Sequence, residues 1–153
     1  MFLKHRLLPW LLASCVGFVL ASISQSQFVL HRLAEVGVAL PVGVRVDFTL
    51  GDLLGLAPAY LPIIAIGLAI ALPIASWLSQ RLAAQAGLRT ALFTLAGFCT
   101  MATILLSMEP IMNITVIAGS RGIAGLLGQC LAGAAAGWLY ALTAPPAASS
   151  QPA

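Results

Sequence analysis

Charged residues are scarce in this chain of 153 residues. There are 7 lysines and arginines and 4 aspartates and glutamates, so 7% of the residues are charged while 61% are hydrophobic. In soluble globular domains about a quarter of the residues are charged. This shortage excludes an ordinary water-soluble domain. The few basic residues are also not interleaved with aromatic residues, so we expect no nucleic-acid partner.

Histidine and cysteine are also few, and they do not cluster. His5 and His31 lie far apart, and Cys15, Cys99 and Cys130 each fall in a different apolar stretch. A metal site needs several such residues at short spacing, and a disulfide framework needs paired cysteines in exposed loops. We therefore expect no metal and no cofactor, and we interpret the cysteines as small buried hydrophobic residues.

Four long stretches contain no charged residue at all: 7–24, 56–79, 90–108 and 122–143. Each is close to the ~20 apolar residues that cross a hydrocarbon core of ~30 Å as a helix. The sequence thus predicts an all-α membrane protein with four transmembrane helices in a single domain over residues 1–143. An outer loop over 25–55 follows the first helix, and we expect a flexible tail over 144–153.

The distribution of the cations predicts the orientation in the membrane. If both termini are cytoplasmic, all four acidic residues lie outside together with three of the seven cations, and the four inside cations are Lys4, Arg6, Arg81 and Arg89. Cytoplasmic loops carry the excess of lysine and arginine. We therefore predict a multi-pass protein of a bacterial-type inner (plasma) membrane with both termini cytoplasmic.

The N-terminal segment has two other interpretations. Basic residues before an apolar run are typical of a signal peptide, which is cleaved off. The residues Leu12-Ala13-Ser14-Cys15 resemble the lipobox of bacterial lipoproteins, which implies lipidation at Cys15. The apolar run continues beyond Cys15, however, where a lipoprotein usually turns polar. We favour an uncleaved anchor and keep cleavage and lipidation as alternatives.

The outer loop contains two short patterns. Residues 28–36 have the spacing of an amphipathic helix that lies on the membrane surface and ends near Gly37. From 42 to 50, apolar residues alternate with glycine and polar residues, which predicts a strand. This strand could pair with 36–40 in a hairpin or with a partner chain, or the alternation could simply place one face on the lipid. Thr49 and Asp52 have the spacing of a capping box that would start the next helix.

Small residues recur every four positions along the fourth apolar stretch. Gly125, Gln129, Gly133 and Gly137 share one face of a helix, and the last two form a GxxxG motif. Small side chains let helix backbones approach closely in lipid, and a glutamine can form a hydrogen bond to a neighbouring helix. We predict that this face packs against another helix, either within the chain or on a partner.

Ser120 and Arg121 precede this stretch and are candidates for contact with an anion or a lipid headgroup. A helix N-terminus with an adjacent arginine suits a phosphate group. The alternative is an arginine at the membrane interface that forms an ion pair with Glu109 or another outer acid.

The sequence determines the function less closely than it determines the fold. Our first hypothesis is association through helix four and the outer loop, with a protein partner or with further copies of the chain, in contact with the lipid bilayer. The alternative is an oligomeric channel or small-solute transporter, although the spans lack the ionisable residue that a proton-coupled carrier needs. A membrane-embedded enzyme that uses Asp47 and Asp52 is less favoured, because the residues typical of two-aspartate membrane proteases do not surround them.

Overall fold

The computed structural model describes residues 4–39, 41–112 and 123–145, and these form four helices: α1 (Lys4–Glu35), α2 (Val42–Arg81), α3 (Ala86–Met112) and α4 (Ile123–Thr143). All four helices are long and apolar enough to cross a membrane. The prediction of an all-α protein with four potential membrane-spanning helices is therefore confirmed. The part of the predicted tail that spans 146–153 lies outside the described residues.

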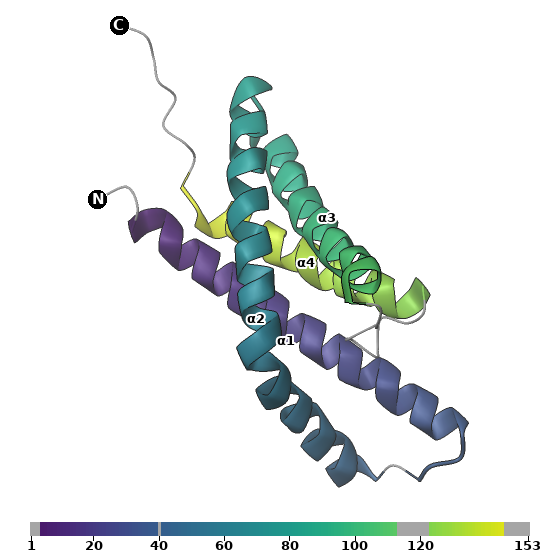
Figure 1. The fold of residues 1–153 in the computed structure, drawn as a ribbon. Coiled ribbons are helices and arrows are strands. Elements are labelled where there is room, and N and C mark those ends of the chain that lie inside the picture. The colour runs from purple at the N-terminus through teal and green to yellow at the C-terminus, as the bar shows by residue number, and fades with distance from the viewer. Residues whose placement is uncertain (1–3, 40, 113–122, 146–153) are drawn as a thin grey trace, which may run out of the picture.

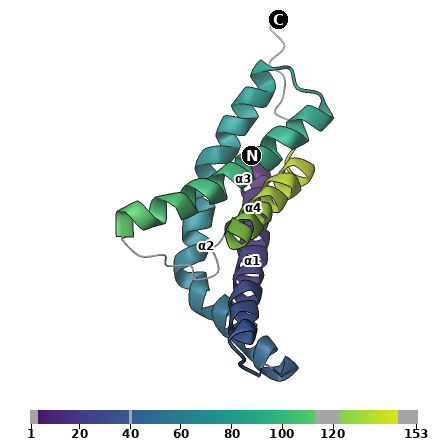
Figure 2. The same cartoon turned by 90° about the vertical axis from the view of Figure 1, so that its right-hand side faces the viewer.

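The helices form a bundle in which each runs antiparallel to the next. In Figure 1, α2 and α3 lie in front of α1 and α4, and the start of α1 and the end of α4 lie at the same end of the bundle. Figure 2 shows α3 crossing α4, with α1 on the other side of α4. The core between the layers contains mainly aliphatic and aromatic side chains, among them Phe18, Tyr60, Ile64, Leu68, Phe93, Met101 and Tyr140.

The helices differ greatly in length. At 1.5 Å per residue, the 21 residues of α4 span about 31 Å, close to the thickness of a bilayer core, while the 32 residues of α1 and the 40 of α2 span about 48 and 60 Å. The excess projects past the ends of α3 and α4 at the bottom of Figure 1. We call the projecting part, residues 25–35 and 42–55, the outer hairpin.

The predicted strand at 42–50 is wrong, and so is the hairpin with 36–40, because α2 already begins at Val42 and the described residues include no strand. A lone strand would leave its backbone groups unpaired, whereas a helix satisfies its own. The facing turns of α1 also give this helix a partner. Ser26 Oγ donates a hydrogen bond to Asp52 Oδ2 at 2.9 Å, and Gln27 Nε2 lies 3.5 Å from Thr49 Oγ1.

The sequence predicted a capping box at Thr49 and a separate surface helix at 28–36, and the described residues form neither. Thr49 does not cap a helix start, because it lies inside α2 and its hydroxyl donates to the carbonyl of Arg45 at 2.8 Å. The separate surface helix at 28–36 is instead the last part of α1. Gly37 does end this helix as expected. With φ of 84°, it donates to Ala34 O, and Val38 donates to Leu33 O, which is a Schellman motif.

The cysteines are only in part the buried residues that we expected. Cys130 is buried in the bundle, but Cys15 and Cys99 lie exposed on the outer surfaces of α1 and α3. The apolar stretches in which they lie do not indicate which side of a helix faces its neighbours. These two thiols therefore lie where a membrane-inserted bundle meets the acyl chains of the lipid.

The turn between α2 and α3 places an alanine in a conformation that suits glycine. Ala83 has φ of 44°, its N–H donates to Gln80 O at 3.1 Å, and the N–H of Ala84 donates to Ser79 O at 2.9 Å. This is again a Schellman motif, with Ala83 at the position that glycine usually occupies. A Cβ in the left-handed region is strained, at a cost of about 1 kcal/mol.

We predict that Ala83→Gly raises the free energy of unfolding by about 0.5–1 kcal/mol, because glycine removes this strain. Thermal unfolding of the purified protein in mild detergent measures the effect. Ala84→Gly is the matched control: Ala84 does not have a positive φ, so the added backbone freedom should lower stability or leave it unchanged. Equal shifts for both variants would contradict the prediction.

Candidate functional site

The glycine face predicted on helix four packs against α3 of the same chain. A Cβ added to Gly97 would overlap the carbonyl oxygen of Gly133, and one added to Gly137 would overlap the carbonyl oxygen of Phe93. A Cβ on Gly133 would overlap both Gly97 and the side chain of Met101. The backbones of α3 and α4 are therefore in direct contact, which only glycine at these positions permits.

Arg89 binds the C-terminal end of α4, where this helix pair begins and ends. Its guanidinium donates to Ala141 O at 2.8 Å and to Ala144 O at 2.9 Å, and it lies 5.2 Å from the ring centroid of Phe93. The last carbonyls of α4 have no partner within the helix and carry partial negative charge. Arg89, which the sequence analysis used only as an inside charge, thus caps α4.

Gln129 lies at the centre of the bundle and is fully buried. Its Nε2 donates to the carbonyl of Ala21 on α1 at 3.0 Å, and its Oε1 accepts a hydrogen bond from the hydroxyl of Tyr60 on α2 at 3.1 Å. One side chain of α4 thereby connects three helices. Both ends of the amide are satisfied, as a buried polar group requires.

A second group of polar residues lies where the outer hairpin leaves the bundle. Ser22, Gln25 and Ser26 follow i, i+3, i+4 spacing and share one face of α1, and Asp52 of α2 contacts Ser26. Ser26 Oγ lies 2.9 Å from Asp52 Oδ2 and 3.0 Å from Ser22 O. We call these four residues the outer polar cluster.

Two atoms of the outer polar cluster lack a partner. Ser22 is 0% exposed and Gln25 is 6% exposed, yet Ser22 Oγ and Gln25 Oε1 have no hydrogen-bond partner among the described residues. Leaving a buried polar atom unsatisfied costs about 1–3 kcal/mol. Such atoms are uncommon. They share a face of α1 with Ser26, which binds the carboxylate of Asp52, and this makes the cluster the candidate site of the molecule.

The structure brings together some of the residues that the sequence predicted. Gly125, Gln129, Gly133 and Gly137 are all buried on α4. Ser120 and Arg121 lie outside the described residues. Asp52 belongs to the outer polar cluster, and the described residues contain no group of three or more His, Cys, Asp or Glu side chains that could hold a metal.

Asp47 and Asp52 lie on different sides of α2. Five residues along a helix correspond to about 140° around its axis, so the two side chains leave α2 in different directions. Asp47 is exposed, whereas Asp52 is partly buried and faces α1. The geometry therefore does not support an enzyme that uses this pair of carboxylates.

The sequence analysis missed Ser22, Gln25 and Ser26, because it treated the first span as uniformly apolar up to residue 24. The signal that would have found them is their shared helical face, which continues the inward-facing positions Ser14 and Phe18. Three neutral polar residues on the core face of a membrane helix are unusual, since each needs a partner there.

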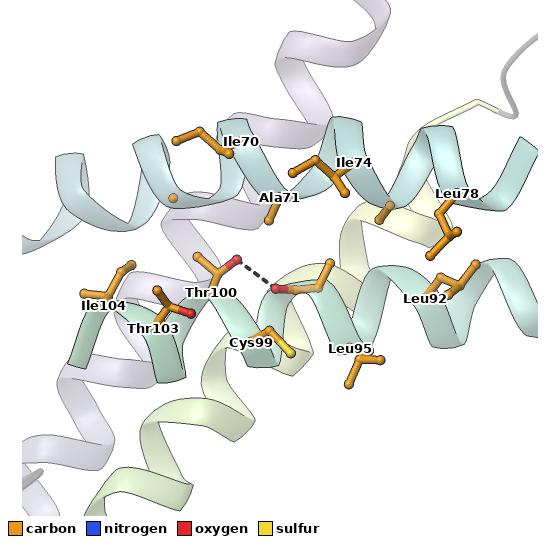
Figure 3. A pocket seen from close by; sticks show the side chains of 13 residues that line it. Ile70, Ala71, Ile74, Leu78, Leu92, Leu95, Cys99, Thr100, Thr103 and Ile104 are labelled. Carbon is orange, nitrogen blue, oxygen red and sulfur yellow. Dashed lines mark hydrogen bonds between the residues drawn. The ribbon is translucent and has the colours of Figure 1, made fainter. Parts of the chain in front are cut away.

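An apolar groove lies between α2 and α3 (Figure 3). It has a volume of about 430 Å³, and its lining includes Ile70, Ile74, Leu92 and Leu95. The hydroxyl of Thr100 donates to Ala96 O at 2.7 Å, the dashed line in Figure 3, and so does not point to a ligand. The groove therefore offers a ligand mainly apolar contacts.

Comparisons of the chain with protein-family models, with curated proteins and with solved structures found no match. The function is therefore argued from the geometry alone.

We predict that Gly133→Leu destabilises the folded monomer more than Gln129→Leu does. Leucine at 133 would force α3 and α4 apart and remove many dispersion contacts, a loss of about 3 kcal/mol or more. Leucine at 129 would leave Tyr60 and the Ala21 carbonyl without their partner, at about 1–2 kcal/mol.

Thermal stability and particle size in mild detergent test this order. Ala124→Leu is the control, because Ala124 is exposed on the same helix, and it should leave stability unchanged. If Gly133→Leu keeps the stability of the unmodified protein, the close contact between α3 and α4 does not exist.

Proposed function

We propose that this chain is a small multi-pass membrane protein that acts by association with another protein, as an accessory subunit of a membrane complex or as a homo-oligomer. The observation that supports the proposal is the outer hairpin. It projects beyond α3 and α4 and there leaves apolar side chains uncovered: Val42 is 78% exposed, Leu54 76% and Leu50 53%. Apolar surface that remains uncovered outside the bundle is typical of an interaction site.

The glycines of the outer hairpin support the same proposal. A Cβ added to Gly17, Gly97, Gly133 or Gly137 would meet a neighbouring helix, whereas one added to Gly51 or Gly55 would meet nothing within 4 Å. Gly51 and Gly55 are four residues apart on α2 and leave a flat surface that a helix can approach closely. We infer that a helix of the partner protein packs along this part of α2.

This proposal places the interface differently from the sequence analysis. Helix four was expected to contribute its glycine face, but that face already packs against α3. The outer loop, which is helical, therefore carries the proposed interface. The membrane we propose is the bacterial-type inner membrane, with both termini cytoplasmic and the outer hairpin on the opposite side.

The alternative function, a channel or small-solute transporter, is favoured by a different observation. The outer polar cluster has two unpaired oxygen atoms on the face of α1 whose Ser26 binds the carboxylate of Asp52. Such groups at the edge of a membrane mark ion or solute sites in many transport proteins.

We predict that a cysteine at position 54 forms intermolecular crosslinks in native membranes. Leu54→Cys would be placed in a background in which Cys15, Cys99 and Cys130 are replaced by alanine, and treated with a short bismaleimide. Products larger than the monomer, identified by mass spectrometry, would separate a second copy from a different protein.

Leu131→Cys is the matched control. Leu131 is 62% exposed on α4, away from the proposed interface, and a cysteine there should stay monomeric. Association through the outer hairpin is refuted if both variants remain monomeric and the protein purifies as a monodisperse monomer without partners.

We predict that Asp47→Cys, in the same cysteine-free background, reacts with a membrane-impermeant maleimide in intact cells. Arg81→Cys should react only after the cells are permeabilised, because the positive-inside rule places Arg81 in the cytoplasm. The reverse pattern would invert the proposed orientation, and labelling of both in intact cells would contradict the placement of the ends of α2 on opposite sides.

A further inference from the structure

We propose that the outer polar cluster binds a small monovalent cation of the sodium class. The site consists of Ser22, Gln25 and Ser26 on α1 and Asp52 on α2. This inference is independent of the association proposed above, because it concerns a site within one chain.

The chemistry of the unpaired atoms points to a positively charged or hydrogen-donating occupant. The Oε1 atom of Gln25 can only accept, and Ser22 Oγ has lone pairs as well as its proton. Neither has a partner among the described residues, although Ser22 is 0% exposed and Gln25 6%. The cluster therefore has more acceptors than the protein groups around it satisfy.

The carboxylate of Asp52 favours a cation over a neutral occupant. Asp52 is half-buried, and its oxygen Oδ2 lies 2.9 Å from Ser26 Oγ, which holds it against the same face of α1. A negative charge removed from water is costly unless an opposite charge lies beside it. Carboxylate, amide carbonyl and hydroxyl oxygens together form the hard ligand set that small alkali and alkaline-earth cations prefer.

The single carboxylate of the cluster favours a monovalent cation. The cluster contains one carboxylate, so a monovalent cation gives a neutral site, whereas a divalent cation would leave a net positive charge at the edge of the membrane. Ca²⁺ also requires 6–8 oxygen ligands, usually with several carboxylates. One carboxylate with neutral oxygens matches a sodium ion.

Gln129 is the polar side chain next to the cluster on the side that faces the centre of the bundle. Gln129, on α4, already uses both ends of its amide on Ala21 and Tyr60. It is therefore not available as a ligand. On the outer side, the partial exposure of Asp52 gives the site access to the aqueous phase. Asp52 is thus the most exposed of the four residues.

The test measures thermal unfolding of the purified protein in mild detergent, with NaCl replaced stepwise by choline chloride at constant ionic strength. We expect the melting temperature to rise in a saturable way with sodium, on the order of 3 °C at a tenfold excess over Kd. Asp52→Asn and Gln25→Leu should abolish the rise. Asp47→Asn, an equal charge change at an exposed position of α2, should preserve it.

Direct binding of ²²Na⁺ by equilibrium dialysis provides a second readout that does not depend on how stable the variants are. Ser22→Ala removes a single oxygen and should weaken binding at least several-fold. The proposal is overturned if the unmodified protein shows neither sodium-dependent stability nor ²²Na⁺ binding, or if Asp52→Asn binds as well as the unmodified protein.

Arg45 lies seven residues before Asp52 on α2 and supplies a further control. Arg45→Gln should leave the sodium response in place. If sodium stabilises only the Arg45→Gln variant, the arginine rather than a bound cation neutralises Asp52, and the proposal fails. If Gln25→Leu is more stable than the unmodified protein and sodium has no effect on either, the cluster holds no ion.

Discussion

The direct backbone contact between α3 and α4 is the constraint on which the rest of the bundle depends. In a bilayer there is no hydrophobic force between helices, so close packing must stabilise their association. Gly97, Gly133 and Gly137 remove the side chains that would hold the two backbones apart. This contact occupies one side of α4, and the adjacent side, with Ala132 and Ala136, packs against Gly17 of α1. Gln129 can therefore reach both α1 and α2.

Polar groups form successive layers along the bundle, and most are satisfied by backbone carbonyls. Arg89 binds the end of α4, Trp10 Nε1 donates to Ala65 O at 3.1 Å, and Gln129 binds Ala21 O. Each such bond connects two helices without requiring a second polar side chain at the same depth. The outer polar cluster differs, because Ser22 Oγ and Gln25 Oε1 have no hydrogen-bond partner within the described part of the chain. That contrast separates groups that stabilise the fold from groups available for binding.

Much of the architecture could be predicted from the sequence because the membrane limits the choices. Long uncharged stretches have one stable solution in lipid, the helix. The first three predicted spans lie within α1, α2 and α3, and residues 123–143 of the fourth form α4. The outer loop was not predictable in the same way. Alternation over 42–50 is compatible with a strand, but whether a strand has a partner depends on distant residues, and here the extended α1 offers Ser26 and Gln27 to a helix instead.

The candidate site was recognised only in part for a related reason. Gln129 is conspicuous as a polar residue in an apolar stretch, and its burial follows from the fold. Ser22, Gln25 and Ser26 are small or neutral, and their significance comes from the face of α1 on which they lie and from Asp52 opposite. That juxtaposition requires the antiparallel pairing of α1 and α2, whose register no local pattern in the sequence specifies.

The hydrogen bond from Gln129 to the carbonyl of Ala21 joins residues 108 positions apart. During synthesis, α1 and α2 emerge first and can pair at once, since their contacts are close in sequence. The inner face of α1 gains its last neighbour only when the final helix has been made. A nascent chain therefore passes through a three-helix stage in which the hydroxyl of Tyr60 has not yet gained its hydrogen bond to Gln129. The fourth helix completes the protein in a late, long-range step, so truncation before it would yield a membrane-inserted but incompletely packed chain.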